Sequence, residues 1–127
     1  MERDNVTSEV HRYNVGEIEV VVISDGFRKT PLDNYLRNAT VEQLAEALGA
    51  AGLPTDHIRN TYSPVLIRTG GHNVLIDTGN GEAAFMQTKG ERGRLNRNLD
   101  TAGIKRIDID KVVISHFHAD HVNGLLL

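Results

Sequence analysis

A short β-rich run leads directly into a cluster of metal-ligand side chains near the end of the 127-residue chain. The segment reads KVVISHFHADH, so three histidines and an aspartate fall within six positions after the apolar residues. Successive side chains of an extended chain point to opposite sides, so residues two apart share a side. We therefore expect His116 and His118 to converge on one metal ion through their imidazole nitrogens.

The run before this cluster predicts a strand over Val112–Ser115. Its apolar residues are consecutive rather than alternating, which is typical of a strand covered on both faces. Asp120 and His121 follow where the chain turns, and they differ in donor type and direction. We therefore expect them to face a second ion beside the first, with Gly124 easing the turn or a close backbone approach.

Composition excludes several other kinds of site. The chain contains no cysteine, which rules out disulfides, thiolate metal sites and a cysteine nucleophile. Its net charge of -3 is spread over interspersed residues of both signs, so no basic face predicts nucleic acid as a partner. No apolar run approaches the roughly 18 residues that span a membrane, and no signal peptide is visible. The expectation is a cytoplasmic protein with no membrane partner.

The length fits a single domain over residues 1–127. The β-branched run predicts a first strand over Glu17–Ser24, which pairs with the alternating segment Glu9–Val15 across a turn at Asn14–Gly16. The segment Phe27–Asn38 has no clean period and is predicted to be a loop.

Two helices are expected. The first starts after Thr40, whose hydroxyl and the Gln43 amide form a capping box. Val41, Leu44, Ala45 and Leu48 then make an apolar stripe, and Gly49 or Gly52 ends the helix. The second is predicted over Glu91–Gly103, with Leu95, Leu99 and Ala102 on one face.

A β-hairpin is predicted between these helices. Its strands are Val65–Thr69 and Asn73–Asp77, and Gly70-Gly71 can adopt the positive φ of a tight turn. His72 belongs to this turn as an exposed residue. Asp77, taken by itself, is a turn residue that ends the strand.

Together these segments resemble the metallo-β-lactamase superfamily. The motif HFHADH with the strand before it looks like the metal-binding signature of that superfamily, and VLIRTGGHNVLIDTG is similar to its hairpin with a closing aspartate. VVISDG and the helix TVEQLAEALGAAGLP resemble the lactonase-like branch, which includes quorum-quenching N-acyl homoserine lactone hydrolases. The resemblance covers almost the whole chain.

The resemblance implies roles for the clustered residues. His116 and His118 would bind a first metal, Asp120 and His121 would bind a second, and Asp77 would support the site from behind the ligands. The cofactor would be one or two zinc ions, with manganese, iron or cobalt as substitutes. A bound zinc lowers the pKa of its water to about 7, which supplies hydroxide at neutral pH. Asp120 would act in catalysis, orienting this water and passing a proton to the leaving group.

The resemblance also implies an α/β fold, the αβ half of a four-layer αβ/βα sandwich. The family takes a further histidine, a bridging aspartate and a last histidine from a second half, and none is matched here. His11, His57 and His72 lie in segments that the family places elsewhere. An open apolar sheet face and the final residues NGLLL favour a truncated chain, with self-association through that face as the alternative.

The expected function is that of a metal-dependent hydrolase acting on a small ester or lactone through a metal-activated water, incomplete or inactive as this chain alone. Glyoxalase II-like thioester hydrolysis and β-lactam hydrolysis are alternatives within the superfamily. Its nucleases carry the same motif but are disfavoured by the lack of a basic patch. A different alternative is a non-catalytic metal-binding half-domain that works by self-association. Metal content and activity would separate these hypotheses.

Overall fold

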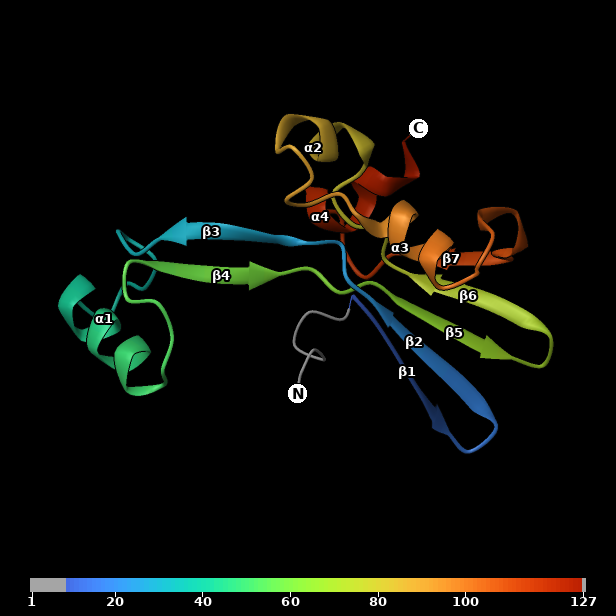
Figure 1. Cartoon of the computed structure of the whole chain (residues 1–127), viewed down its shortest axis with the longest axis horizontal. Helices are drawn as coiled ribbons and strands as arrows, with labels where there is room; N and C mark the ends of the chain where they lie inside the picture. The colour runs from blue at the N-terminus through green and yellow to red at the C-terminus, as the bar shows by residue number, and fades with distance from the viewer. Residues whose placement is uncertain (1–8, 127) are drawn as a thin grey trace. The chain divides into compact units, whose positions relative to one another are not determined.

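The computed structural model describes residues 9–126 and divides into two compact units. One unit joins the segment that ends at Gly26 to the segment that begins at Thr61, and the other is Phe27–Asn60. The metal-ligand cluster and the main sheet both belong to the first unit (Figure 1).

Five strands form the sheet of the first unit. In spatial order they are β1 (Val10–Val15), β2 (Ile18–Ile23), β5 (Val65–Thr69), β6 (His72–Ile76) and β7 (Lys111–Val113). The first four pair antiparallel, and β7 pairs parallel with β6. Because β6 and β7 run the same way, their carboxyl ends meet at one edge of the sheet, where the cluster follows β7.

Both predicted hairpins are confirmed. The turn between β1 and β2 lies at Gly16 and Glu17 rather than at the predicted Asn14–Gly16, because Val15 pairs with Ile18 and Gly16 takes φ 61°. Between β5 and β6, Gly70 and Gly71 have φ 55° and 78°, as a type I′ turn requires. Strand β6 begins and ends one residue before the predicted bounds, so Asp77 lies just beyond its end.

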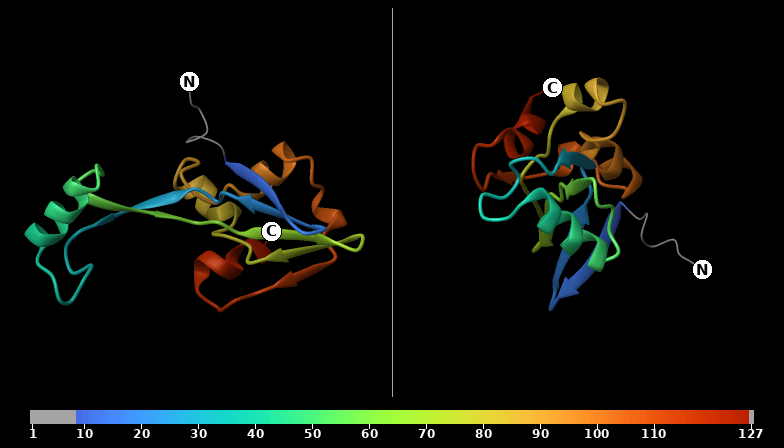
Figure 2. Two further views of the ribbon diagram at one scale, coloured as in Figure 1. Left: turned by 90° about the horizontal axis from the view of Figure 1, so that it is seen from below. Right: turned by 90° about the vertical axis from the view of Figure 1, so that its left-hand side faces the viewer.

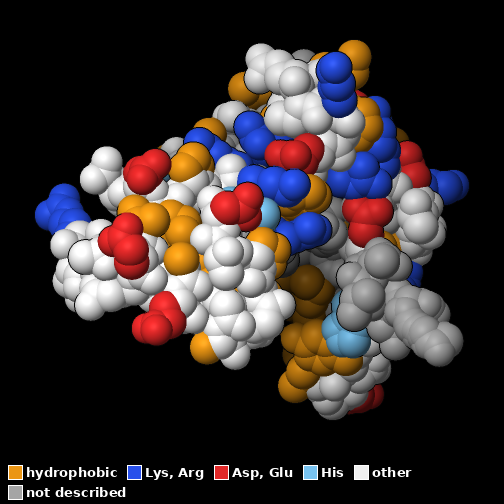
Figure 3. Space-filling view, turned by 60° about the vertical axis from the view of Figure 1, so that its left-hand side comes forward, with side chains coloured by type: hydrophobic (Ala, Val, Ile, Leu, Met, Phe, Trp, Pro, Cys, Tyr) orange, Lys and Arg blue, Asp and Glu red, His pale blue; other side chains and the backbone are white. Residues whose placement is uncertain are grey.

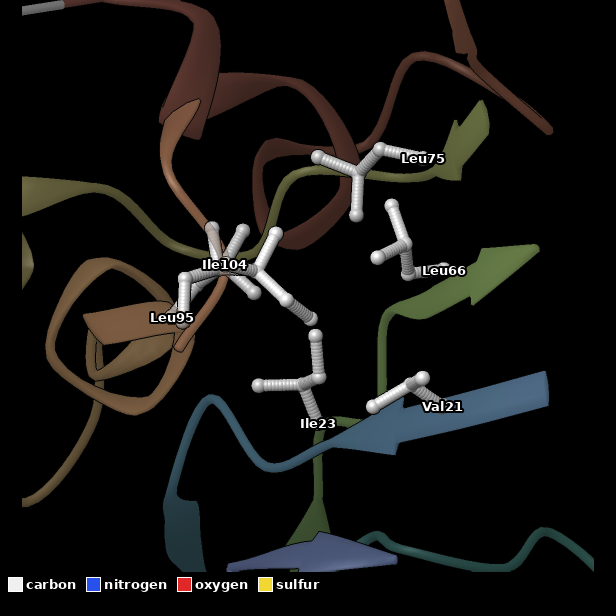
Figure 4. Packing of buried hydrophobic residues seen from close by; sticks show 7 residues of the cluster. Val21, Ile23, Leu66, Leu75, Leu95 and Ile104 are labelled. Carbon is white, nitrogen blue, oxygen red and sulfur yellow. The ribbon is translucent and has the colours of Figure 1, made fainter. Parts of the chain in front are cut away.

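The core lies against one face of this sheet. Val21, Ile23, Leu66 and Leu75 point from the strands toward the segment of α3 (Leu95–Thr101), as Figure 4 shows. Leu95 and Leu99 of α3 are buried there, together with Ile104, which follows the helix. Burying each such side chain favours folding by about 1.5–3 kcal/mol.

The other face of the sheet is apolar but partly open. Three side chains of β1 and β2 on this face remain exposed to solvent. Tyr13 is 46% exposed, Val15 60% and Ile18 37%. Strand β7 also departs from its prediction, since Val112 and Val113 are 41% and 50% exposed rather than covered. Its edge position explains the exposure, because β6 is the one strand that pairs with it among the described residues.

The helices of the first unit are short. They are α2 (Glu82–Gln87), α3, α4 (Ala119–Val122) and the 3₁₀ turns η2 (Arg106–Asp108) and η3 (Asn123–Leu125). The predicted helix from Glu91 is wrong in its first turn, because Arg92 bridges to Gly26 and Gly93 takes φ 79°. Helix α2 was not predicted. No helix within residues 9–126 has the length and apolar character needed to cross a bilayer.

The second unit contains β3 (Phe27–Pro31), α1 (Val41–Ala50) and the start of β4 (His57–Thr61). The loop predicted over Phe27–Asn38 is wrong at its start, because β3 pairs with β4 in a two-stranded sheet. Figure 2 shows α1 at the end of this pair where β3 finishes and β4 begins.

The capping box of α1 is confirmed. The Thr40 hydroxyl accepts from the Gln43 N–H at 3.0 Å, and the Thr40 N–H donates to Gln43 Oε1 at 2.9 Å. The helix ends at Ala50, and Gly52 follows with φ 75°. No residue of α1 is buried, so its apolar stripe does not contribute to a core within the described structure.

Candidate metal centre

The cluster sits where β7 leaves the sheet and the chain turns into α4. Ser115 and His116 follow the strand, and His118 is the residue before the first turn of α4, with extended backbone angles. The His121 N–H donates to the His118 carbonyl at 2.9 Å. This local turn brings Asp120 and His121 back beside the two preceding histidines.

His116 and His118 come together as predicted. Their atoms His116 Nε2 and His118 Nδ1 are 3.1 Å apart, and the two rings meet edge to face. Two nitrogen ligands of a tetrahedral zinc, each about 2.0–2.1 Å from the ion, lie about 3.3 Å from one another. The spacing therefore fits a shared ion. Both residues are exposed.

Asp120 and His121 form a second pair. Asp120 Oδ2 lies 3.1 Å from His121 Nε2, and both side chains are about one-third exposed or less, at 33% and 25%. The rings of His116 and His121 are 3.8 Å apart between centroids, so the two pairs are neighbours. Each pair thus offers two converging donor atoms.

Asp77 fixes the proton of His121. Asp77 Oδ2 lies 2.7 Å from His121 Nδ1, and an ionised carboxylate can only accept. Nδ1 must therefore carry a proton toward Asp77, and Nε2 is the ring nitrogen that faces Asp120. Metal-binding histidines in proteins are held by carboxylates in this way.

The environment of Asp77 keeps it ionised. Burial raises the pKa of its carboxyl, but hydrogen bonds from the Ser115 N–H, from His121 and from the Ser115 hydroxyl together bring that pKa below its ordinary value. Both Ser115 contacts are 2.8 Å long. Asp77 takes φ 65°, a left-handed conformation that aspartate adopts more readily than most residues. Asp77 thus contacts the His121 ring, and its supporting role behind metal ligands stays a prediction.

Ser115 was missed by the sequence reasoning. Its hydroxyl oxygen lies 2.8 Å from Asp77 Oδ2, 3.0 Å from His116 Nδ1 and 3.2 Å from His121 Nδ1. It therefore contacts one histidine of each pair as well as Asp77. The available signal was its position directly before His116, at the end of the predicted strand.

The donor set fits a divalent transition metal, although the geometry is incomplete. Nitrogen and carboxylate oxygen donors suit zinc and also manganese, iron and cobalt. Within residues 9–126, no three histidine, aspartate or glutamate side chains are arranged to hold one ion together. The remaining histidines lie elsewhere: His57 contacts Asp56 at 2.8 Å, His72 is 3.8 Å from Asp110, and His11 packs beside Tyr13.

A cavity of about 180 Å³ opens beside the second pair. It is lined by Thr61, Tyr62, Ser63, Pro64, Asp77, Asp120 and His121. No sequence pattern marks Tyr62 or Ser63, because they line the cavity only through the course of the chain between β4 and β5. Asp120 and His121 thus border a hollow on the surface of the first unit.

Curated proteins similar to this chain include two kinds of relative. The lactamase-like protein adaB of Aspergillus niger is 33% identical over 97 residues, which cover 72% of this chain and 27% of adaB. Ribonuclease Z of Thermococcus sibiricus is 32% identical over 79 residues, which cover 62% of this chain and 21% of that enzyme. The chain thus spans about a quarter of the length of these relatives.

Solved structures agree on the fold. The dizinc quorum-quenching lactonase AidC superposes with a TM-score of 0.82 at 26% identity, over 91% of this chain and 38% of that one. The hydrolase AbOPH of the β-lactamase superfamily gives a TM-score of 0.77 at 20% identity over the same shares, which shows the fold alone. The expected αβ part of the larger fold is confirmed. A sequence model of the metallo-beta-lactamase superfamily matches residues 59–127, and the chain belongs to that superfamily.

Proposed function

We propose that this chain supplies the metal-binding and water-orienting part of a metal-dependent hydrolase that acts on a small ester or lactone. The observation that carries the proposal is the pair of donor spacings, 3.1 Å within each of two neighbouring side-chain pairs. When bound, a metal ion supplies Lewis acidity and lowers the pKa of a water molecule.

Each residue has a distinct proposed role. His116 and His118 would hold one ion, and Asp120 and His121 would hold a second. Asp77 would keep a proton on Nδ1 of His121, where it does not compete with a ligand bond. Asp120 would also orient a water molecule beside the cavity and pass a proton to the leaving group. Zinc is the proposed ion, and manganese, iron or cobalt are the alternatives.

Lactones and small carboxylic esters are the proposed substrates. The similarity to AidC, a lactonase whose solved structure is a complex with the product N-hexnoyl-L-homoserine, supports this class. The volume beside Asp120, about 180 Å³, suits a small acyl or lactone group. Thioesters and β-lactams present the same carbonyl chemistry and are the alternatives.

RNA is the less favoured substrate despite the matches to ribonuclease Z. RNA-binding surfaces concentrate lysine and arginine to contact phosphates. On the face shown in Figure 3, Lys and Arg side chains lie among Asp and Glu side chains, and the net charge of the chain is -3. This mixture of charges favours a small substrate.

One assay series tests the proposal. The purified chain is loaded with Zn²⁺ and incubated separately with an N-acyl homoserine lactone, a thioester, a β-lactam and a short RNA. We expect the lactone to be hydrolysed fastest, at a low rate because only two donors face each ion where catalytic zinc takes three. Faster cleavage of RNA would overturn the substrate assignment. The matched His118→Ala and Asp120→Ala variants should lose the activity.

The alternative of a non-catalytic half-domain rests on the open sheet face with Tyr13, Val15 and Ile18. If the chain works by self-association through this face, sedimentation equilibrium would give a dimer that Val15→Asp dissociates. Metal binding without hydrolysis of any of the four substrates, together with such a dimer, would favour this alternative. A metal-loaded monomer that hydrolyses the lactone would exclude it.

A further inference from the structure

Asp25 is a fully buried carboxylate outside the metal centre. It lies two residues beyond the end of β2 and is 0% exposed. Its Oδ2 accepts from the Asn80 N–H at 2.7 Å and from Asn80 Nδ2 at 2.8 Å, and its Oδ1 accepts from the Leu95 N–H at 2.9 Å. Burying an ionised carboxylate costs free energy unless hydrogen bonds replace its lost hydration, so the Asp25 carboxylate depends on all three of these donors.

The backbone around Asp25 is held as firmly as its side chain. Its N–H donates to the Tyr62 carbonyl at 2.8 Å, and its carbonyl accepts from the Gly93 N–H at 2.8 Å. Gly79 presses directly on the carboxylate, because a Cβ at that position would lie 2.6 Å from both carboxylate oxygens. Asp25 therefore fixes the position of the Gly79-Asn80 segment against the sheet.

The two residues before the Gly79-Asn80 segment, Asp77 and Thr78, hold His121. The Thr78 N–H and hydroxyl both donate to the His121 carbonyl, at 2.9 and 2.8 Å. Asp77 binds the His121 ring. Gly124 packs so closely on the Thr78 carbonyl that a side chain there would collide with it. The loop Asp77–Asn80 is thus fastened to Asp25 on one side and to His121 on the other.

We propose that Asp25 is a positioning residue for the metal centre. By holding Asn80 and Gly79, it sets the place of the loop Asp77–Asn80, and through that loop it sets the orientation of the His121 ring. The effect on metal binding rests on the proposed function. The effect on the His121 ring does not, because it concerns the metal-free chain.

The isosteric variant Asp25→Asn tests this proposal. Whichever way its amide turns, the NH₂ group faces a donor, so the variant loses either the Leu95 bond or both Asn80 bonds. It also lacks the negative charge that strengthens all three, which weakens the hold on the loop at nearly constant volume. Asp100→Asn is the matched control, since Asp100 is an exposed residue of α3.

The first readout is the ¹⁵N NMR spectrum of the His121 ring without metal. The parent chain and Asp100→Asn should show the same His121 ring signals at the same pH, and Asp25→Asn should show shifted and broadened ones, because the ring is no longer held in one orientation. A folded Asp25→Asn variant with an unchanged His121 ring would overturn the proposal. A changed ring in a variant that unfolds as cooperatively as the parent supports it, because a general loss of structure would also lower that cooperativity.

The second readout is titration with Co²⁺ alone. We expect Asp25→Asn to bind at least about tenfold more weakly, with an altered visible spectrum, and Asp100→Asn to match the parent. A parent chain that binds no Co²⁺ would count against the proposed function, while the ring measurement would still decide the role of Asp25.

A second variant covers the case in which Asp25→Asn does not fold. Gly79→Ala places a methyl group against the Asp25 carboxylate at φ 75° and should produce the same change in the His121 ring signals. Loss of cooperative thermal unfolding in both variants would overturn the proposal and make Asp25 a residue that stabilises the whole unit.

Discussion

The carboxylate of Asp77 and the ring of His121 are joined by a 2.7 Å hydrogen bond across 44 residues of sequence. This contact ties the end of β6 to the first turn of α4, so the β5–β6 hairpin determines how a candidate ligand is presented. It also keeps a proton on Nδ1 of that ring, because an ionised carboxylate can only accept a hydrogen bond.

Replacing Asp77 by asparagine should therefore weaken metal binding without removing a ligand. The amide of the Asp77→Asn variant can donate as well as accept, so the Nδ1 proton of His121 is no longer imposed. We expect an affinity for Zn²⁺ about tenfold to a hundredfold lower, measured by competition with a chromophoric chelator. Asp100→Asn is the control, and equal affinities for the two variants would refute the role of Asp77.

The Leu99 side chain tests the packing that supports the sheet. It is 1% exposed and lies between α3 and the strands, so Leu99→Ala should lower the free energy of unfolding by about 2–5 kcal/mol. Leu126→Ala, at a position 71% exposed, should change it by less than about 0.5 kcal/mol. Urea denaturation measures both values, and similar losses for the two variants would contradict the assigned core.

The ion pair of Glu9 and Arg94 predicts a dependence of stability on pH. The hydrogen bond from Arg94 is the largest cause that lowers the pKa of Glu9, burial opposes it, and Asn98 assists. A lowered folded pKa means that the contribution is present above the unfolded pKa of about 4.3 and is lost as pH falls through the folded value.

Glu9→Gln should accordingly be less stable than the parent at pH 7 and equal to it at strongly acidic pH. Since the Glu9 and Arg94 side chains are 37% and 31% exposed, solvent screening should keep the difference below about 1 kcal/mol. Urea midpoints at several pH values provide the measurement, with the exposed Glu17→Gln as control. A stability difference between the parent and Glu9→Gln that grows as the pH falls would contradict the assigned effect of the ion pair.

Local signals predicted much of the fold. The capping box at Thr40 and the Gly70-Gly71 turn are determined by residues within a few positions, so the sequence shows them directly. Strand β3 was missed because a loop, helix α1 and a second loop separate it in sequence from its partner β4. The exposure of β7 was missed for a related reason: consecutive apolar residues show that a strand is apolar, but not which elements cover it.

In the candidate site, too, features set by neighbouring residues could be predicted and features set by distant contacts could not. The motif from His116 to His121 contains the donor atoms, and their chemistry is readable from residue type and spacing. Asp77 could be included only through the family resemblance, because 44 residues separate it from His121. Asp25 could not be assigned a role from the sequence, since its role depends on contacts with Asn80 and Leu95 that only the folded chain creates.

The most direct test of the central claim is a Zn²⁺ titration of the parent chain beside His118→Ala and His72→Ala, followed by calorimetry. His118 belongs to a candidate ligand pair, whereas His72 is an exposed residue of β6 near Asp110. The account predicts that the parent and His72→Ala bind zinc alike and that His118→Ala binds at least about tenfold more weakly. Equal binding by all three chains would contradict the assignment of the metal centre.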